Sequence, residues 1–171
     1  MGEDARSRGA RAPGPTNPDL GVWQGRRVAR RYLSPDGFVV LVGRSAEDND
    51  ILSVKIASPR DFWLHVASGP GSHVVVRNPD GLPRLPRETL RFAAGLAAAH
   101  SNARAGGRVA IHLATAGDVS KPRGFSPGKV EIRRFETVTA SPLHLDPADG
   151  STVPNGPGGG RRGPAPGRGR G

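Results

Sequence analysis

DFWLHV at residues 61–66 and GSHVVVR at residues 71–77 are the two stretches that decide the fold. Both alternate between apolar and polar positions, which is the side-chain period of a β-strand. The connecting residues 67–70, ASGP, favour a turn, so the pattern predicts a β-hairpin. One face of this hairpin carries the aliphatic side chains and Phe62. The other displays Trp63, His65, His73 and Arg77, a set suited to binding or catalysis.

Five further stretches predict strands. Residues 28–33 and 38–42 flank the turn sequence SPDG and predict a second hairpin. Residues 51–56 alternate with Leu52, Val54 and Ile56 on one side. Residues 108–113 alternate in the same way, and residues 130–133 predict a short last strand.

One helix is predicted, from Arg87 to Ala103. Pro86 suits a helix start, and residues 92–99 are mostly alanine and carry no charge. Gly95 lowers helix stability by about 1 kcal/mol relative to alanine. A glycine in the helix despite this cost predicts that another segment of the backbone approaches closely at that position. The parts predict an α+β fold: a mainly antiparallel, twisted sheet of six to seven short strands with one Ala-rich helix and disordered termini.

The ends of the chain differ in composition from its middle. Residues 1–20 and 149–171 are rich in Gly, Pro and Arg and poor in apolar residues. Neither end can bury enough apolar surface to offset an ordering entropy of about 1–2 kcal/mol per residue. We therefore expect a disordered tail at residues 1–20, one folded domain at 21–148 and a second disordered tail at 149–171.

The chain is strongly basic. Its 25 Lys and Arg residues against 15 Asp and Glu residues give a net charge of +10. Residues 21–150 keep 18 basic and 12 acidic residues, a net charge of +6. A basic core is consistent with a polyanionic partner. Arg outnumbers Lys 22 to 3, however, which is also the bias that a GC-rich genome produces.

The sequence also excludes several classes of protein. There is no Cys, so disulfides and thiolate metal sites are excluded. The first twenty residues hold no apolar leader, and no run approaches the ~20 apolar residues of a membrane span. We therefore expect a soluble, cytoplasmic protein without membrane contact.

Several motifs in a fixed order carry a family resemblance. The pattern Asp-x-Trp-x-His from Asp61, followed by Gly71-Ser72-His73 and an aliphatic strand, resembles the NFACT RNA-binding domain (NFACT-R) of ribosome-associated quality control factors. Gly43-Arg44 and residues 47–50, EDND, resemble its opening block, with Ser45 where the family shows Asn. The Ala-rich run to Ser101 and residues 119–130 resemble its closing block, so the resemblance extends from residue 30 to residue 142.

Two sets of site residues are expected. Cations would contact phosphates, Trp63 or a His would stack on an unpaired base, and the Pro- and Gly-bearing loop after Asp118 would approach phosphates closely. The expected RNA-binding residues are Arg44, Lys55, Trp63, His65, His73, Arg77, Lys121, Arg123, Lys129 and Arg133. The residues expected to fix the motif structurally are Asn49, Asp50, Asp61, Gly71, Ser72 and Gly128.

The resemblance implies a free-standing RNA-binding domain that works in a ribosome-associated or quality-control context. Its expected partners are tRNA or ribosomal RNA, with the large ribosomal subunit as a further partner, and no cofactor or metal ion is expected. The C-terminal Arg-Gly sequence resembles an RNA tether, with biased codon usage as an equal alternative.

Two other function classes stay open. One is a metal-dependent nuclease or hydrolase, whose metal site would draw on Asp48, Asp50, Asp61, His65, His73 and His112. The other is a protein-docking module that does not touch RNA. The sequence shows no phosphate-binding loop, nucleophile elbow or paired carboxylates, so we do not expect an enzyme.

Overall fold

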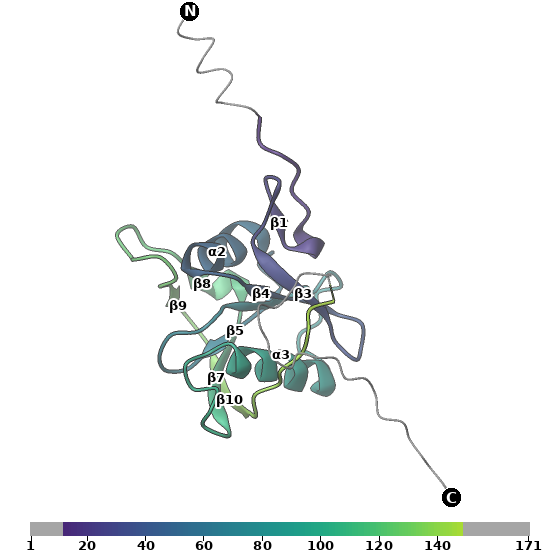
Figure 1. Ribbon diagram of the computed structural model, residues 1–171, viewed down its shortest axis with the longest axis vertical. Coiled ribbons are helices and arrows are strands. Elements are labelled where there is room, and N and C mark those ends of the chain that lie inside the picture. Colours follow the sequence, from purple (N-terminus) through teal and green to yellow (C-terminus); the bar gives the residue numbers. More distant parts are fainter. Residues whose placement is uncertain (1–11, 149–171) are drawn as a thin grey trace, which may run out of the picture.

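The computed structural model describes residues 12–148 (Figure 1). Residues 1–11 of the tail expected at residues 1–20, and the whole tail expected at residues 149–171 with its Arg-Gly sequence, lie outside the described residues. The strands are β1 (Val22–Trp23), β2 (Arg26–Arg27), β3 (Ala29–Leu33), β4 (Val39–Gly43), β5 (Phe62–Val66), β6 (Val74–Val76), β7 (Val109–Thr115), β8 (Val119–Ser120), β9 (Glu131–Ile132) and β10 (Glu136–Ala140). The helices are η1 (Pro18–Leu20), α2 (Ala46–Asp50), η2 (Ile51–Ile56), α3 (Arg87–Ala99) and η3 (Ala116–Asp118).

Six strands form one sheet in the order β10-β7-β5-β6-β4-β3, and every neighbouring pair is antiparallel. The α+β fold class is therefore confirmed. The predicted hairpins are β3–β4 and β5–β6, the second with Trp63 opposite Val75. The last strand of the sheet, β10, was not predicted. Residues 131–132, where a last strand was expected, pair only with β8 in a separate two-stranded ribbon.

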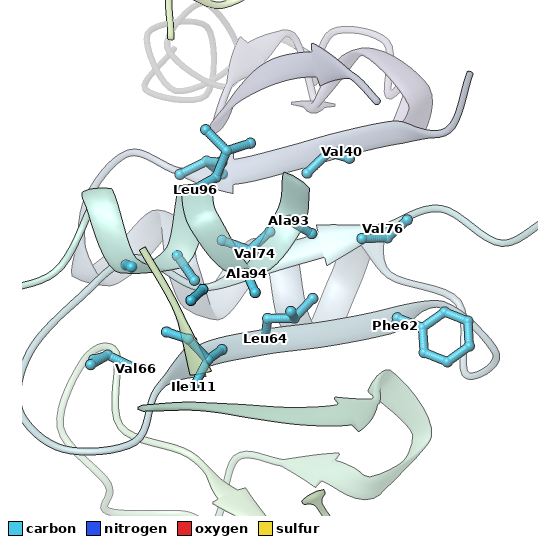
Figure 2. Close-up of a cluster of buried hydrophobic side chains, with 14 of the residues drawn as sticks. Val40, Phe62, Leu64, Val66, Val74, Val76, Ala93, Ala94, Leu96 and Ile111 are labelled. Atoms are coloured by element: carbon cyan, nitrogen blue, oxygen red, sulfur yellow. The ribbon is translucent and has the colours of Figure 1, made fainter. Parts of the chain in front are cut away.

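Helix α3 covers one face of the sheet. Its small side chains, among them Ala93, Ala94 and Ala97, pack on Leu64 and Val74, and Figure 2 shows the helix lying directly over the strands. The helix ends at Ala99 rather than at Ala103. Beyond it, residues 100–103 bond to the β5–β6 connection instead: the Ser72 N–H donates to the His100 carbonyl, and the Asn102 N–H donates to the Pro70 carbonyl.

The close approach expected at Gly95 is confirmed. The chain that follows β10 crosses the helix there, and the Leu143 N–H donates to the Gly95 carbonyl at 2.9 Å. A β-carbon at Gly95 would lie 2.8 Å from the β-carbon of Leu143. Because real β-carbons do not approach so closely, only glycine lets this segment cross the helix.

The opposite face of the sheet is covered over its central strands, and here the prediction from sequence is wrong. Residues 51–56 form no strand; α2 continues into the π-helical η2. Leu52 and Ile56 are buried while Val54 is 45% exposed, because residues four apart share one side of a helix. They pack with Trp63 and Val75 in a second apolar cluster. In Figure 1 the sheet strands lie between α2 and α3.

The N-terminal boundary also differs from the expected one. Within residues 12–20, η1 forms a short turn, Asn17 bridges to Val22, and the Asp19 carboxylate lies 3.1 Å from the Arg77 guanidinium. The domain therefore begins before residue 21. Among residues 12–148, none of the helices has the length and apolar character that crossing a membrane requires.

Candidate nucleic-acid interface

A chain of buried hydrogen bonds runs from Trp63 through Ser53 to His73. The Trp63 indole Nε1–H donates to the Ser53 hydroxyl at 2.9 Å, and that hydroxyl lies 2.8 Å from His73 Nδ1. His73 Nε2 lies 3.0 Å from the Gly128 carbonyl oxygen, which can only accept, so Nε2 carries the proton. Nδ1 then accepts from Ser53. The network thus fixes one neutral tautomer of a histidine that is 1% exposed.

Burial, with the nearby His65 ring as a second cause, lowers the pKa of His73 to about 4. The free energy of unfolding should therefore fall as the pH drops from about 6.5 to 4, because the unfolded chain takes up a proton that the folded chain refuses. His73 alone accounts for about 3 kcal/mol of this loss. Urea unfolding at pH 7, 5.5 and 4 should show a shallower pH dependence for His73→Gln than for wild type. Equal pH dependence in both would contradict the prediction; burial also lowers the pKa of His100 to about 4, but that contribution is common to the two proteins.

Asn49 joins the two hairpins. Its side-chain carbonyl accepts the His73 N–H at 3.0 Å, and its amide nitrogen lies 3.4 Å from the Gly71 carbonyl. A β-carbon on Gly43 would collide with the Asn49 amide, so the glycine is required by this contact. Ser72 donates its hydroxyl proton to the Gly43 carbonyl at 3.0 Å. The motif residues thus hold one another in place.

Asp50 fixes the loop at residues 121–129. Its carboxylate accepts the Gly128 N–H at 3.1 Å and pairs with the Lys121 ammonium, also at 3.1 Å. Lys121 additionally donates to the carbonyls of Ser126 and Lys129, so its charge is used inside the loop. Gly128 has φ +83°, which favours glycine.

Asp61 is the buried acceptor at the start of β5. It is 2% exposed, and its carboxylate accepts from the Ser58 N–H at 2.9 Å, the Asn78 N–H at 2.8 Å and the Arg77 guanidinium. Arg77 also donates to the Ile56 carbonyl. This pair ties the hairpin to the end of η2.

These elements surround a groove of about 560 Å³, here called the motif groove. It is lined by Arg44, Ser45, Ala46, Asn49, Trp63, His65, Gly69, Pro70, Gly71, Ser72, His73, His100, Pro127, Gly128, Lys129, Val130 and Ile132. Of the expected RNA-binding cations, the groove brings together Arg44 and Lys129, beside the partly buried His65. Burial lowers the pKa of His65, so this ring offers a neutral surface near pH 7.

The expected base-stacking platform at Trp63 is wrong. Trp63 is 1% exposed, since η2 covers the sheet face on which it lies, and its ring stacks on His65 with centroids 5.8 Å apart. His73 is buried for the same reason. Trp63 and His73 therefore contribute packing and hydrogen bonds rather than an RNA-facing surface.

The remaining expected cations are spread over the molecule. Arg77 is held by Asp61 and Asp19, and Arg133 pairs with Asp118 at 2.7 Å outside the motif groove. Lys55 and Arg123 are exposed but do not line the groove. Ser45, where the family shows Asn, accepts the Asp48 N–H and caps α2, a role that Ser and Asn share.

The side chains considered for a metal site have separate partners. Asp48 pairs with Arg26 at 2.9 Å, Asp50 with Lys121, and Asp61 with Arg77. Among residues 12–148, no group of three or more His, Asp or Glu side chains is placed to hold a metal ion.

Sequence reasoning missed Ser53 and His100. Ser53 lies four residues after Asn49, and both side chains bond His73, one to its backbone and one to its ring. That i, i+4 spacing of polar residues was the available signal for a helix. His100 lines the motif groove just beyond the end of α3 at Ala99. No residue pattern in the sequence predicts that the helix ends there.

Comparison with known proteins finds similar sequences in bacteria and eukaryotes. The chain is 35% identical over 117 residues to "Rqc2 homolog RqcH" of Bacillus subtilis, covering 67% of this chain and 20% of that protein. It is 28% identical over 72 residues to human "Ribosome quality control complex subunit NEMF", covering 42% of this chain and 7% of that protein. The chain thus spans about a fifth of the length of the bacterial relatives.

A solved structure and a family model also match this chain. The C-terminal part of the fibronectin/fibrinogen-binding protein from Streptococcus suis superposes with a TM-score of 0.63 at 35% identity, over 69% of this chain and 47% of that one. The model of the NFACT protein RNA binding domain matches residues 28–134, well over half of the sequence. The chain therefore belongs to the NFACT protein RNA binding domain family.

Proposed function

We propose that this chain binds structured RNA, such as tRNA or ribosomal RNA, through the motif groove in a ribosome-associated role. One observation carries the proposal: Arg44 and Lys129 line the same groove, and neither has an acidic partner within residues 12–148. Cations that the fold does not neutralise are available for phosphates. Family membership and relatives named as ribosome quality control subunits give the same direction.

The walls of the groove support this use. Asn49 fixes its backbone at Gly71, and Asp50 and His73 fix it at Gly128, each through a hydrogen bond. A rigid groove loses little conformational entropy when RNA binds, so its exposed cations can contribute most of their electrostatic attraction. The two glycine-bearing loops also let phosphates approach backbone amides closely.

Binding to bulk tRNA should be micromolar or tighter and should weaken steeply with salt. We expect log K to fall linearly with log salt between about 50 and 200 mM, because phosphate neutralisation releases counterions. Arg44→Gln and Lys129→Gln should each weaken binding several-fold and lower the slope by about one. Fluorescence anisotropy with the full chain measures both quantities.

Two controls separate the groove from other cations. Arg91→Gln removes a charge on α3 that is 62% exposed and lies outside the motif groove, and it should leave affinity unchanged. Replacing Arg161, Arg162, Arg168 and Arg170 with Gln in the full chain measures what the C-terminal arginines add. Loss of all binding in that tail variant alone would move RNA recognition out of the domain and refute the proposal.

A further inference from the structure

A second groove lies where β10 separates from β7. The two strands pair from Val109 to Leu113, and the pairing ends at Leu113 opposite Glu136, so β7 continues to Thr115 without β10 beside it. The space left there has a volume of about 630 Å³ and is lined by Phe62, Leu113 and Phe135, among others. We call it the Phe135 groove. Of the site residues expected from the sequence, only Arg133 lines it.

Phe135 is a supported but exposed aromatic ring. Half of the residue is exposed, and its ring lies 4.0 Å from the His112 ring, centroid to centroid, at an interplanar angle of 37°. A ring backed by a second ring keeps its orientation and presents a free surface at little entropic cost. Phe62, which also lines the groove, is 7% exposed and packs on the α3 side of the sheet, and Figure 2 shows its ring at the end of its strand, at the margin of the apolar cluster. The lining of the groove therefore includes an exposed aromatic ring and buried apolar residues.

The rim of the Phe135 groove is lined by three arginines and by two carboxylates, those of Asp118 and Glu136, and so carries one net positive charge. Arg133 and Arg134 share one carboxylate, that of Asp118, at 2.7 and 3.8 Å, and their side chains are 70% and 77% exposed. Arg84 also lines the groove and is exposed, with no ion pair inside residues 12–148. Such a rim is complementary to phosphates. It is not complementary to residues 151–171 of the chain itself, which carry four arginines and no acidic residue.

We propose that the Phe135 groove binds one unpaired nucleotide of an RNA, with the base stacked on Phe135 and the flanking phosphates against Arg84 and Arg134. Base stacking on aromatic side chains, next to cations that follow the backbone, is how proteins hold unpaired RNA. The volume lies within the ~300–1,000 Å³ typical of small-ligand sites. This inference rests on the RNA binding proposed above and adds which part of the RNA the domain selects.

The test compares two RNA hairpins, one fully paired and one identical except for a single bulged 2-aminopurine nucleotide. The full chain should bind the bulged hairpin about tenfold more tightly, in line with the stacking of one base, and should quench the 2-aminopurine fluorescence. Phe135→Ala should abolish both the preference and the quenching while binding to the paired hairpin is unchanged. Arg84→Gln should weaken binding to the bulged hairpin without removing the quenching. Leu33→Ala, which truncates a 47% exposed side chain on the edge strand β3, is the matched control and should change nothing.

The outcomes separate this inference from the proposed function. Equal affinity of the wild-type chain for the two hairpins would overturn the nucleotide site and leave RNA binding in place. Failure to bind either hairpin or tRNA would overturn both. If a fluorescently labelled acidic, phenylalanine-containing peptide binds the wild-type chain while the two hairpins bind equally well, the groove belongs to a protein partner. That result would overturn the inference. If Phe135→Ala alters the circular dichroism spectrum, Arg84→Gln and the quenching in the wild type decide the question.

Discussion

Replacing Trp63 with alanine should lower the free energy of unfolding by about 3–5 kcal/mol. The side chain is 1% exposed and fills the second apolar cluster between the sheet and η2. Its removal leaves a cavity that the surrounding helix and sheet can close only in part. Urea unfolding gives the stability change.

Two milder variants define what Trp63 does. Trp63→Phe keeps an aromatic ring but loses the donor to Ser53, so we expect a loss of about 1–3 kcal/mol. Trp23→Ala removes the other tryptophan, which is only partly buried at the edge of the same cluster, and should cost less than Trp63→Ala. Weakened RNA binding by a fully stable Trp63→Phe would restore the stacking role that its burial excludes.

Removing the Asp61 carboxylate should cost a comparable amount. Asp61→Ala leaves the largely buried Arg77 guanidinium and the N–H groups of Ser58 and Asn78 without their acceptor. Breaking one side of a buried ion pair costs about 3–5 kcal/mol, and we expect that loss in urea unfolding at pH 7. The nearby but exposed Asp80 offers a matched control, since Asp80→Ala should change stability by less than about 0.5 kcal/mol.

A double-mutant cycle tests whether the Asp61–Arg77 contact itself carries the effect. Arg77→Met removes the cation while keeping an apolar stem of similar length. The double variant should be less destabilised than the sum of the two single variants, because the second substitution removes the charge that the first left unpaired. Strict additivity would show that the backbone N–H groups, and not Arg77, depend on Asp61.

The parts of the fold that the sequence predicted are those set by local patterns. The hairpins β3–β4 and β5–β6 combine alternation with a turn sequence, and helix α3 follows from an alanine-rich run after Pro86. The strand predicted at residues 51–56 was wrong. Apolar side chains at every second position of a six-residue stretch also place Leu52 and Ile56 on one side of a helix. Over so short a window the two periods cannot be told apart.

The wrong strand prediction for residues 51–56 also caused the wrong prediction that Trp63 is exposed in the site. Alternation correctly separated the two sides of β5, but it cannot tell whether the second side faces solvent or another element. Once residues 51–56 become a helix, they cover Trp63 and His73. The partners of the charged residues could not be predicted for a different reason. Asp50 and Lys121 are 71 positions apart in sequence, so their ion pair depends on the tertiary structure. Phe135 lies in no periodic sequence pattern, so the sequence did not predict it as a site residue.

Helix α3 covers one face of the sheet and η2 covers Trp63 and Val75 on the other, so the centre of the sheet offers no broad platform to a nucleic acid. The two contacts proposed here lie in grooves of about 560 and 630 Å³. Each such contact engages only a few nucleotides, so its strength in isolation is limited. Tight attachment would then come from avidity: a second contact on the same RNA raises the effective concentration of the first, by a factor that the spacing between the two sets. The arrangement therefore favours RNAs whose shape reaches both grooves at once.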